Sequence, residues 1–245
     1  MNSLICISSV PDTTTKIVFD AAGKGLNKSG VQFVINPYDE FALVRALEFK
    51  EKLNVGKVVV LSVGEADVDQ VLRKALAIGA DEAVRIDAAP RDARFVAEQI
   101  AAYAKDKNFD LIMGGKESID FNGAEVMGMV AALLDLPFIS FATSLEINGR
   151  TAEIRREVDG GTEILECPLP LVLGAQKGMA EWRMPNMRGI MAARTKPLAV
   201  VKPVEAKAYT ESVKFEQPPA KAGCKYIDPK NVHEIVKVLQ EKGVI

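Results

Sequence analysis

The sequence contains few of the residues on which metal sites and hydrolytic centres depend. Its 245 residues include one histidine, His233, and three cysteines, Cys6, Cys167 and Cys224, which lie far apart and form no C-x-x-C pair. One histidine and scattered cysteines do not supply a histidine-ligated zinc site, and three separate cysteines do not make a disulfide framework. We therefore expect a reducing compartment, no metal site and no hydrolytic activity.

An excess of one charge and long apolar runs are also missing. The sequence has 31 lysines and arginines against 33 acidic residues, a net charge of −2, which argues against nucleic acid or an anionic membrane as the main partner. Apolar stretches such as 58–63 are far shorter than the roughly 20 residues of a membrane span. Asp12 and Lys16 interrupt the region where a secretory signal would lie. We expect a cytoplasmic chain without membrane insertion.

The first half of the chain alternates short apolar runs with segments of helical period. The runs are typical of buried strands and cover residues 4–7, 58–63, 82–87 and 111–114. The helical segments cover residues 38–52, 68–76 and 92–107, and Gly79 is a natural stop for the second. Strands that alternate with helices favour right-handed crossovers and a mostly parallel sheet. The sequence therefore predicts an α/β fold.

The second half contains an antiparallel meander, which we place at residues 138–174. Residues 144–147 lead into Asn148-Gly149, a strong hairpin signal, and residues 152–158 return. Asp159-Gly160-Gly161 then turns the chain into residues 162–167. Pro168 and Pro170 bracket a last apolar strand at 171–173. The meander is expected to be appended to the sheet or to extend it.

The C-terminal region reads as an extended arm that ends in a helix. Residues 202–225 contain several prolines and no clear period. Asp228 is expected to cap the final helix, with Pro229 in its first turn. The helix has an apolar face formed by Val232, Ile235, Val236 and Leu239. This face is equally compatible with docking on the domain of its own chain or on a partner subunit. We divide the chain into a domain at residues 1–201 and an arm with its helix at residues 202–245.

Three small, polar segments follow predicted strands and are candidates for ligand binding. They cover residues 8–15, 62–64 and 114–120, and Asn122-Gly123 is expected to open a further helix. In open α/β sheets ligands bind beyond the carboxyl ends of the strands, where glycines and helix N-termini favour phosphate. None of the segments matches a P-loop or a G-x-G-x-x-G motif, so ordinary turns remain the alternative. No acid–base cluster accompanies them, which predicts binding rather than catalysis.

Residues 179–191 form a second unusual segment. It holds four of the eight methionines and the only tryptophan, Trp182, with arginines interleaved. Methionine, tryptophan and arginine are favoured at binding surfaces, whereas the alternative is core filling by methionine with solvated arginines. Pro185 and Gly189 argue against a clean helix at its start. We therefore interpret the segment as a partner-docking surface.

Several groups of residues, in the right order, carry a resemblance to a known family. Asn36-Pro37 precedes the first long helix, residues 73–77 read Arg-Lys-Ala-Leu-Ala before Gly79-Ala80-Asp81, and residues 115–120 read Gly-Lys-Glu-Ser-Ile-Asp. The most specific group lies in the meander and consists of Ile154, Arg156, Asp159, Gly160, Gly161, Glu163, Leu165, Pro170, Val172 and Leu173. Gly174 departs from the family pattern. Nearly end to end, the chain resembles the β subunit of electron-transfer flavoprotein.

The resemblance implies a Rossmann-like nucleotide-binding sheet in an electron carrier rather than an enzyme. Such a β subunit pairs with an α subunit that holds most of a redox-active FAD, and it buries a structural AMP. The heterodimer takes electrons from flavin dehydrogenases, such as acyl-CoA dehydrogenases in fatty acid oxidation, and passes them to a quinone oxidoreductase. One alternative is a bifurcating, NADH-oxidising relative with a second FAD in place of AMP. Another is a stand-alone adenine-nucleotide-binding module.

The resemblance also implies a set of nucleotide-binding residues. They are Cys6, Ser8, Asn36, Val63, Gly64, Gly115, Lys116, Ser118, Asp120, Gly123, Ala124, Glu125 and Val126. Residues 121–126 match neither the AMP pattern nor the bifurcating pattern well. Ala124 has no side-chain donor, and the Glu125 carboxylate beside a phosphate would cost free energy unless it turns away. AMP remains the expected ligand.

The docking surface corresponds, by the same resemblance, to a recognition loop at residues 179–195. The family anchors its dehydrogenases through one apolar side chain of this loop, and Met187 is the expected anchor, followed by Ile190 and Met191. The Pro-Asn pair that normally follows the anchor here precedes Met187, as Pro185-Asn186. Met184 is therefore the alternative anchor.

Overall fold

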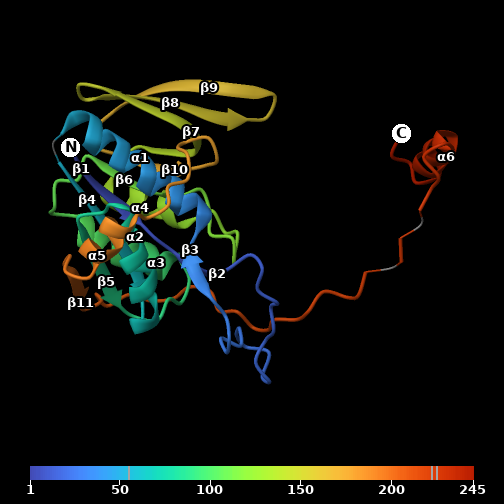
Figure 1. Cartoon of the computed structure of the whole chain (residues 1–245), viewed down its shortest axis with the longest axis horizontal. Coiled ribbons are helices and arrows are strands. Elements are labelled where there is room, and N and C mark those ends of the chain that lie inside the picture. The colour runs from blue at the N-terminus through green and yellow to red at the C-terminus, as the bar shows by residue number, and fades with distance from the viewer. Residues whose placement is uncertain (55, 222, 225) are drawn as a thin grey trace.

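The computed structural model describes residues 1–54, 56–221, 223–224 and 226–245. Its centre is a nine-stranded sheet in which seven neighbouring strands are parallel and the last two are antiparallel (Figure 1). In spatial order the strands are β11 (Leu198–Val201), β5 (Glu82–Asp87), β4 (Lys57–Gly64), β1 (Asn2–Cys6), β6 (Leu111–Gly115), β10 (Leu171–Ala175), β7 (Phe138–Asn148), β8 (Thr151–Val158) and β9 (Gly161–Pro168). The predicted α/β fold is confirmed.

Helices cover both faces of the parallel part. On one face lie α1 (Pro37–Leu53), α2 (Asp69–Ile78), which a short 3₁₀ turn (Ala66–Val68) precedes, and α5 (Met187–Ala193). On the other lie α3 (Ala93–Ala104) and α4 (Val126–Leu134). Successive side chains of a strand point to opposite faces, so Ile5 packs toward α1 and α2 while Leu4 packs toward α3 and α4. Among the described residues, no helix is long and apolar enough to cross a membrane.

The meander extends the main sheet instead of forming a separate one. The start of β7 pairs in parallel with β10, and the rest of β7 pairs antiparallel with β8, which in turn pairs with β9. Gly149 and Gly160 lie in its two turns with φ of 63° and 86°, a conformation that glycine adopts without steric cost. The sequence prediction of a hairpin followed by a second turn is confirmed.

Two small strand pairings were not predicted. β11 follows α5 and pairs in parallel with β5 at the edge of the sheet, so the prediction that residues 171–173 form the last strand is wrong. β2 (Ser9–Pro11) and β3 (Phe33–Ile35) form a two-stranded antiparallel sheet where we expected only a loop. Runs of three or four residues carry too little periodicity to stand out from their flanks.

Two helices begin later than predicted. Helix α4 begins at Val126 and not at Asn122-Gly123, because Asn122 and Ala124 have left-handed φ values of 53° and 54°. Helix α6 (Val232–Glu241) has Asn231 in the capping position. Asp228 instead accepts a hydrogen bond from the Lys230 backbone N–H at 2.9 Å in the preceding turn, so its predicted capping role is wrong.

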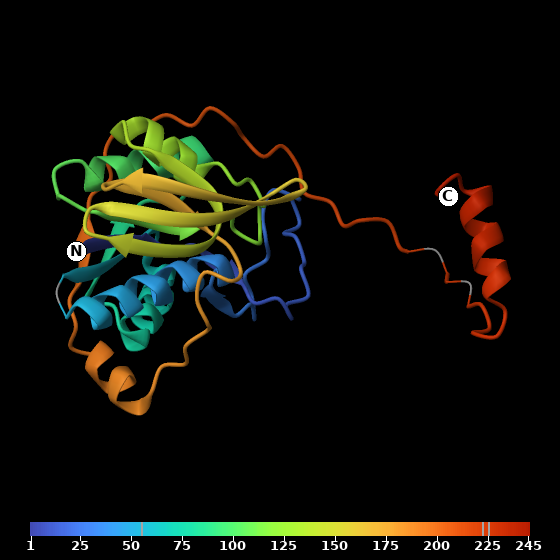
Figure 2. The ribbon, with the colours of Figure 1, turned by 90° about the horizontal axis from the view of Figure 1, so that it is seen from above.

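The C-terminal arm consists of two parts with different surroundings. The first part follows the domain surface, since Gln99 and Val204 exchange two hydrogen bonds of 2.8 and 2.9 Å and the Phe215 N–H donates to the Gly23 carbonyl at 2.8 Å. Gln217 donates from Nε2 to the Ile17 carbonyl at 2.5 Å, whereas α6 stands apart from the domain (Figures 1 and 2). No described residue of α6 is buried. The apolar face of α6 does not lie on the domain of its own chain in this structure.

Candidate functional site

The carboxyl ends of neighbouring parallel strands bring most of the predicted nucleotide-binding residues to one edge of the sheet. Cys6 ends β1, Gly64 ends β4 and Gly115 ends β6, and these three strands are neighbours in the order β4-β1-β6. Ser8 follows β1, and residues 116–120 follow β6. We call this arrangement the strand-end site. It lies where a doubly wound sheet binds its ligand.

Asn36 joins the beginning of α1 to the loop after β6. Its side-chain amide is fully buried, with Nδ2 donating to the Glu117 carbonyl at 2.9 Å and Oδ1 accepting from the Ile119 N–H at 3.2 Å. Both halves of the amide are therefore occupied by this loop. Asn36 fixes the shape of residues 117–119 and thereby the floor of the strand-end site.

Asp39 is a residue of this site that the sequence interpretation missed. Its carboxylate is 3% exposed and accepts hydrogen bonds from the Ser8 N–H at 2.7 Å and the Gly115 N–H at 2.6 Å. Burial raises the pKa of Asp39 to about 6, against the lowering effect of these two N–H donors. An acidic residue on the inward face of a helix, followed by Ala42 and Leu43 one turn later, was the available signal.

The glycines at the strand ends accommodate the protein's own side chains. A Cβ added to Gly115 would lie 2.5 Å from the Tyr38 Cβ and 2.7 Å from Asp39 Oδ1. A Cβ added to Gly64 would lie 2.5 Å from a Val68 methyl carbon. These glycines allow α1 and the 3₁₀ turn to approach the strand ends closely, so the space expected for a phosphate at these two positions is filled by protein.

Cys6 contributes an unreactive thiol to the floor. It is buried, and burial together with the neighbouring Asp39 charge raises the pKa of its thiol. A thiol that stays protonated is neither a nucleophile nor a metal ligand. Among the described residues, no group of three or more His, Cys, Asp and Glu side chains is arranged to hold a metal ion.

Lys116 directly follows Gly115 in the sequence, and its ammonium group already contacts other side chains. Its Nζ lies 3.2 Å from a Glu117 carboxylate oxygen and over the rings of Tyr38 and Phe141, at 5.0 and 5.3 Å from their centroids. Cation–π contacts of this kind favour a fixed ammonium position. Phe141 also lines an open depression of about 730 Å³ that is formed by residues of β7, β8, β9 and the turn between the last two, including the signature residues Arg156 and Asp159.

The loop between β6 and α4 forms the open side of the site. Ser118 and Val126 are half-buried, whereas Asp120, Gly123, Ala124 and Glu125 are exposed. The Glu125 side chain makes no capping hydrogen bond to α4, and among the described residues no side chain accepts from the first N–H groups of this helix. Such N–H groups and the helix dipole favour an anion. The exposed Glu125 carboxylate has room in solvent to turn away from one.

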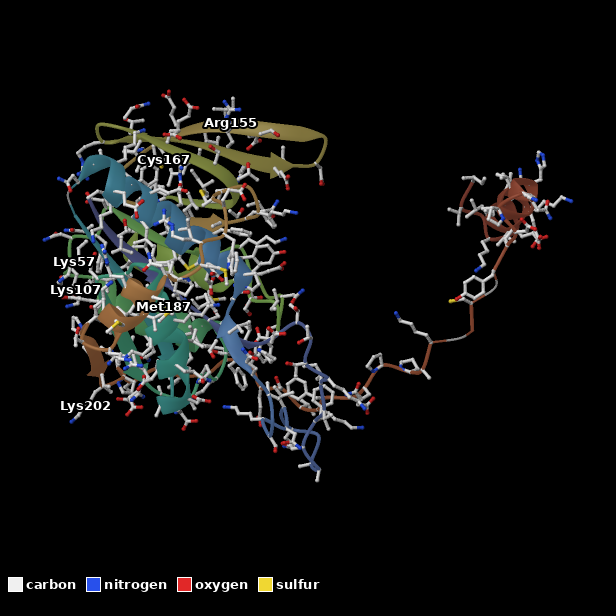
Figure 3. The ribbon with its side chains drawn as sticks, in the orientation of Figure 1. Lys57, Lys107, Arg155, Cys167, Met187 and Lys202 are labelled. Atoms are coloured by element: carbon white, nitrogen blue, oxygen red, sulfur yellow. The ribbon has the colours of Figure 1, made fainter. Side chains whose placement is uncertain are left out.

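The methionine-rich segment lies apart from the strand-end site, beside the C-terminal half of α2 (Figure 1; Met187 is labelled in Figure 3). We call residues 183–196 the docking segment. Its apolar side chains are exposed, at 71% for Met184, 74% for Met187, 66% for Met191 and 41% for Ile190. Met179 is buried, so core filling explains this methionine. Pro185 and Gly189 do not prevent a helix, because Asn186 caps α5 by accepting from the Gly189 N–H at 2.8 Å.

Comparison with known proteins agrees with this architecture. A family model described as "Electron transfer flavoprotein domain" matches residues 24–206. The chain is 41% identical over 202 residues to electron transfer flavoprotein subunit beta of Bacillus subtilis, covering 81% of this chain and 77% of that protein. It is 37% identical over 233 residues to the subunit of Syntrophomonas wolfei (94% and 91% covered) and 32% over 252 residues to the human subunit (99% and 98%). The chain belongs to the family of electron transfer flavoprotein beta subunits.

Proposed function

We propose that this chain pairs with an α subunit and serves as the recognition and nucleotide-binding half of a soluble electron carrier. The carrier accepts electrons from flavin dehydrogenases, such as acyl-CoA dehydrogenases, and delivers them to a quinone oxidoreductase. FAD, held mainly by the α subunit, supplies the redox chemistry. The observation that carries the proposal is the separation of a packed strand-end site from an exposed apolar docking segment. Binding and recognition need such surfaces, whereas an acid–base cluster is not required for electron transfer.

We expect AMP to occupy the strand-end site as a structural ligand. The buried floor at Cys6, Asn36 and Gly115 offers a rigid surface for the base and ribose. Asp39 already occupies the N–H groups of Ser8 and Gly115, so a phosphate is directed toward the unoccupied N–H groups at the start of α4. The exposed side chain of Glu125 is compatible with this placement.

Dehydrogenases are recognised, in this proposal, by the docking segment. Met187 is the expected anchor and Met184 the alternative; both are more than two-thirds exposed. Large, adaptable apolar side chains that protrude from an ordered backbone are typical of interface anchors. Helix α6 supplies the contact with the α subunit through its apolar face.

A nucleotide inventory tests the proposed function. The chain is co-expressed with its α subunit, the complex is purified and denatured, and the released FAD and AMP are quantified per heterodimer. One FAD and one AMP are expected. Two FAD without AMP would replace the proposal by the bifurcating alternative and make NADH oxidation the next assay. One FAD alone would show that residues 121–126 no longer support a second nucleotide.

A further inference from the structure

The backbone of the docking segment is braced against α2 by two cations that act reciprocally. Arg73 of α2 donates from Nη1 to the carbonyl groups of Ala193 and Lys196, both at 2.8 Å, at and just after the end of α5. Lys196 donates from Nζ to the carbonyl groups of Leu76 and Ala80, at 3.0 and 2.6 Å, at and just after the end of α2. Each helix therefore has its C-terminal carbonyl groups satisfied by a cation from the other segment.

The middle of α5 is also in close contact with α2. A Cβ added to Gly189 would overlap the carbonyl oxygen of Ala77, so the two backbones approach as closely as a glycine permits. Ala193 at the end of α5 is buried beneath the same contact. A residue larger than glycine at position 189 would have to push α5 away from α2.

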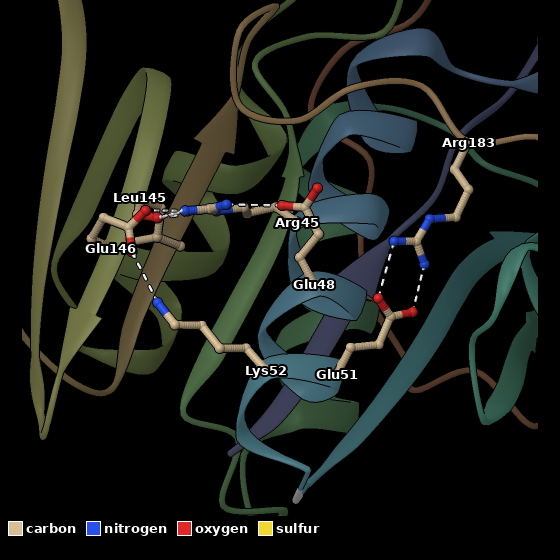
Figure 4. A network of polar contacts seen from close by, with 7 residues as sticks. All are labelled: Arg45, Glu48, Glu51, Lys52, Leu145, Glu146 and Arg183. Carbon is tan, nitrogen blue, oxygen red and sulfur yellow. Dashed lines mark hydrogen bonds and ion pairs between the residues drawn. The ribbon is translucent and has the colours of Figure 1, made fainter.

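The chain that leads into α5 is fixed as well. Arg183 makes a two-point ion pair with Glu51 near the end of α1, at 2.6 and 3.1 Å (Figure 4). Asn186 then caps α5. Both ends of the docking segment are thus tied to helices of the domain, whereas its apolar side chains point into solvent.

A helix as short as α5 depends on such contacts. Seven residues make a single pair of turns, and isolated helices of this length are unstable in water. Without the bracing, a partner would have to order the segment as it binds, and that entropic cost would weaken the complex. The bracing therefore determines how the exposed methionines are presented.

We infer that Arg73 and Lys196, both half-buried, are positioning residues for dehydrogenase recognition, because their hydrogen bonds join the end of α5 to α2. They hold α5 in the geometry in which Met184 and Met187 meet the partner together. The inference rests on the proposed docking function of this segment. It adds that the recognition element is a preformed platform, ordered before the partner arrives.

The test compares Arg73→Ala with Arg94→Ala as a matched control. Arg94 is also a helical arginine, but it bonds to Glu98 one turn along α3 on the other face of the sheet. In the heterodimer, Arg73→Ala should speed amide hydrogen exchange at residues 187–196. It should also raise the KM for the carrier about fivefold in its reduction by medium-chain acyl-CoA dehydrogenase with octanoyl-CoA. The kcat and the bound FAD should be unchanged, and Arg94→Ala should change neither readout.

Two further variants sharpen the result. Arg73→Lys, which retains one charged donor, should give an intermediate KM. Gly189→Ala tests the direction of the change in KM, because alanine is the better helix former and would strengthen an isolated helix. In the braced segment it should instead loosen α5 and raise the KM.

The outcomes separate this inference from the proposed function. Unchanged exchange in Arg73→Ala, or faster exchange with an unchanged KM, would overturn the positioning role. A lower KM in Gly189→Ala would overturn it too. If Met184→Ala and Met187→Ala leave the KM unchanged in the same assay, the docking function fails, while the exchange data still decide whether Arg73 orders the segment.

Discussion

The strand-end site and the docking segment use hydrogen bonds for different purposes. At the strand-end site, the polar groups are satisfied from within, since Asn36 and Asp39 occupy the amides of the loop and of the strand ends. In the docking segment, hydrogen bonds order the backbone while the apolar side chains remain exposed. The first arrangement favours a stable, buried ligand. The second favours a partner that binds and leaves.

Helix α2 lies between the two regions. Its preceding 3₁₀ turn packs on Gly64 at the carboxyl edge of the sheet, and its C-terminal end is bonded to Lys196. The regions therefore share a rigid element but, among the described contacts, no ligand-facing residue. Changes in one region are therefore expected to leave the other intact.

The largest effect is expected from removal of residues 218–245. A stop after Gln217 deletes α6 with its exposed apolar face but keeps the part of the arm that bonds to Gln99 and Gly23. The truncated chain should fold and lose co-purification with the α subunit, which pull-down measures. Replacement of Ile235 and Val236 by serine in the full chain is the matched test of the helix face. Retention of the heterodimer by both would show that α6 does not hold the partner.

Asp39→Ala should have the next largest effect. It removes the acceptor for two N–H groups at a buried position, and each unsatisfied group costs about 1–3 kcal/mol. The free energy of unfolding should fall by about 2–5 kcal/mol in denaturant titrations. Asp120→Ala, which changes an exposed carboxylate of the same site, is the control and should stay within about 0.5 kcal/mol of the wild type. Equal losses in both variants would contradict the structural role of Asp39.

Met187→Ala should affect recognition alone. Truncation of an interface anchor typically costs about 2 kcal/mol or more, so the KM for the dehydrogenase should rise at least tenfold while the melting temperature and FAD content stay the same. Met184→Ala in the same assay identifies which methionine is the main anchor. If neither substitution alters steady-state electron uptake, the docking segment does not recognise the dehydrogenase.

The smallest effect is a pH dependence of stability. Burial raises the pKa of Asp39 to about 6. At pH values between the ordinary pKa of an aspartate and about 6, the folded state therefore holds a proton on Asp39 that the unfolded state has lost. Stability contributed by this group is therefore greatest at low pH and declines as the pH rises through that interval. The difference in melting temperature between wild type and Asp39→Asn should favour the wild type more at about pH 4.5 than at about pH 7. The opposite trend would contradict the assigned protonation behaviour.

The sequence predicts the elements that have long patterns and misses those that have short ones. Parallel strands such as β4 and β6, and the hairpin at Gly149, follow from apolar runs and turn residues. β11 was missed because its four residues are too few to show a strand period between Pro197 and the arm. The left-handed residues Asn122 and Ala124 delay α4, and no local pattern indicates that an alanine adopts this conformation.

The arrangement of the candidate site could be predicted only in part, for a similar reason. The segments that contain Gly64 and Gly115 follow from the rule that ligands bind beyond the ends of parallel strands, whereas Cys6 was expected only from the family resemblance. The contacts of Asp39 and of Arg73 join residues 76 and 120 positions apart, and local periodicity contains no information about such pairs. The same limit applies to Met179 and Met184, which lie five positions apart in one segment but are buried and exposed, respectively.

The separation of nucleotide binding from partner recognition is the central claim, and AMP content per heterodimer tests it most directly. The measurement compares the wild type with Asp39→Ala and Met187→Ala after purification with the α subunit. The account predicts one AMP in the wild type, a clear loss in Asp39→Ala and no change in Met187→Ala. Loss of AMP in Met187→Ala, or full retention in Asp39→Ala, would contradict it.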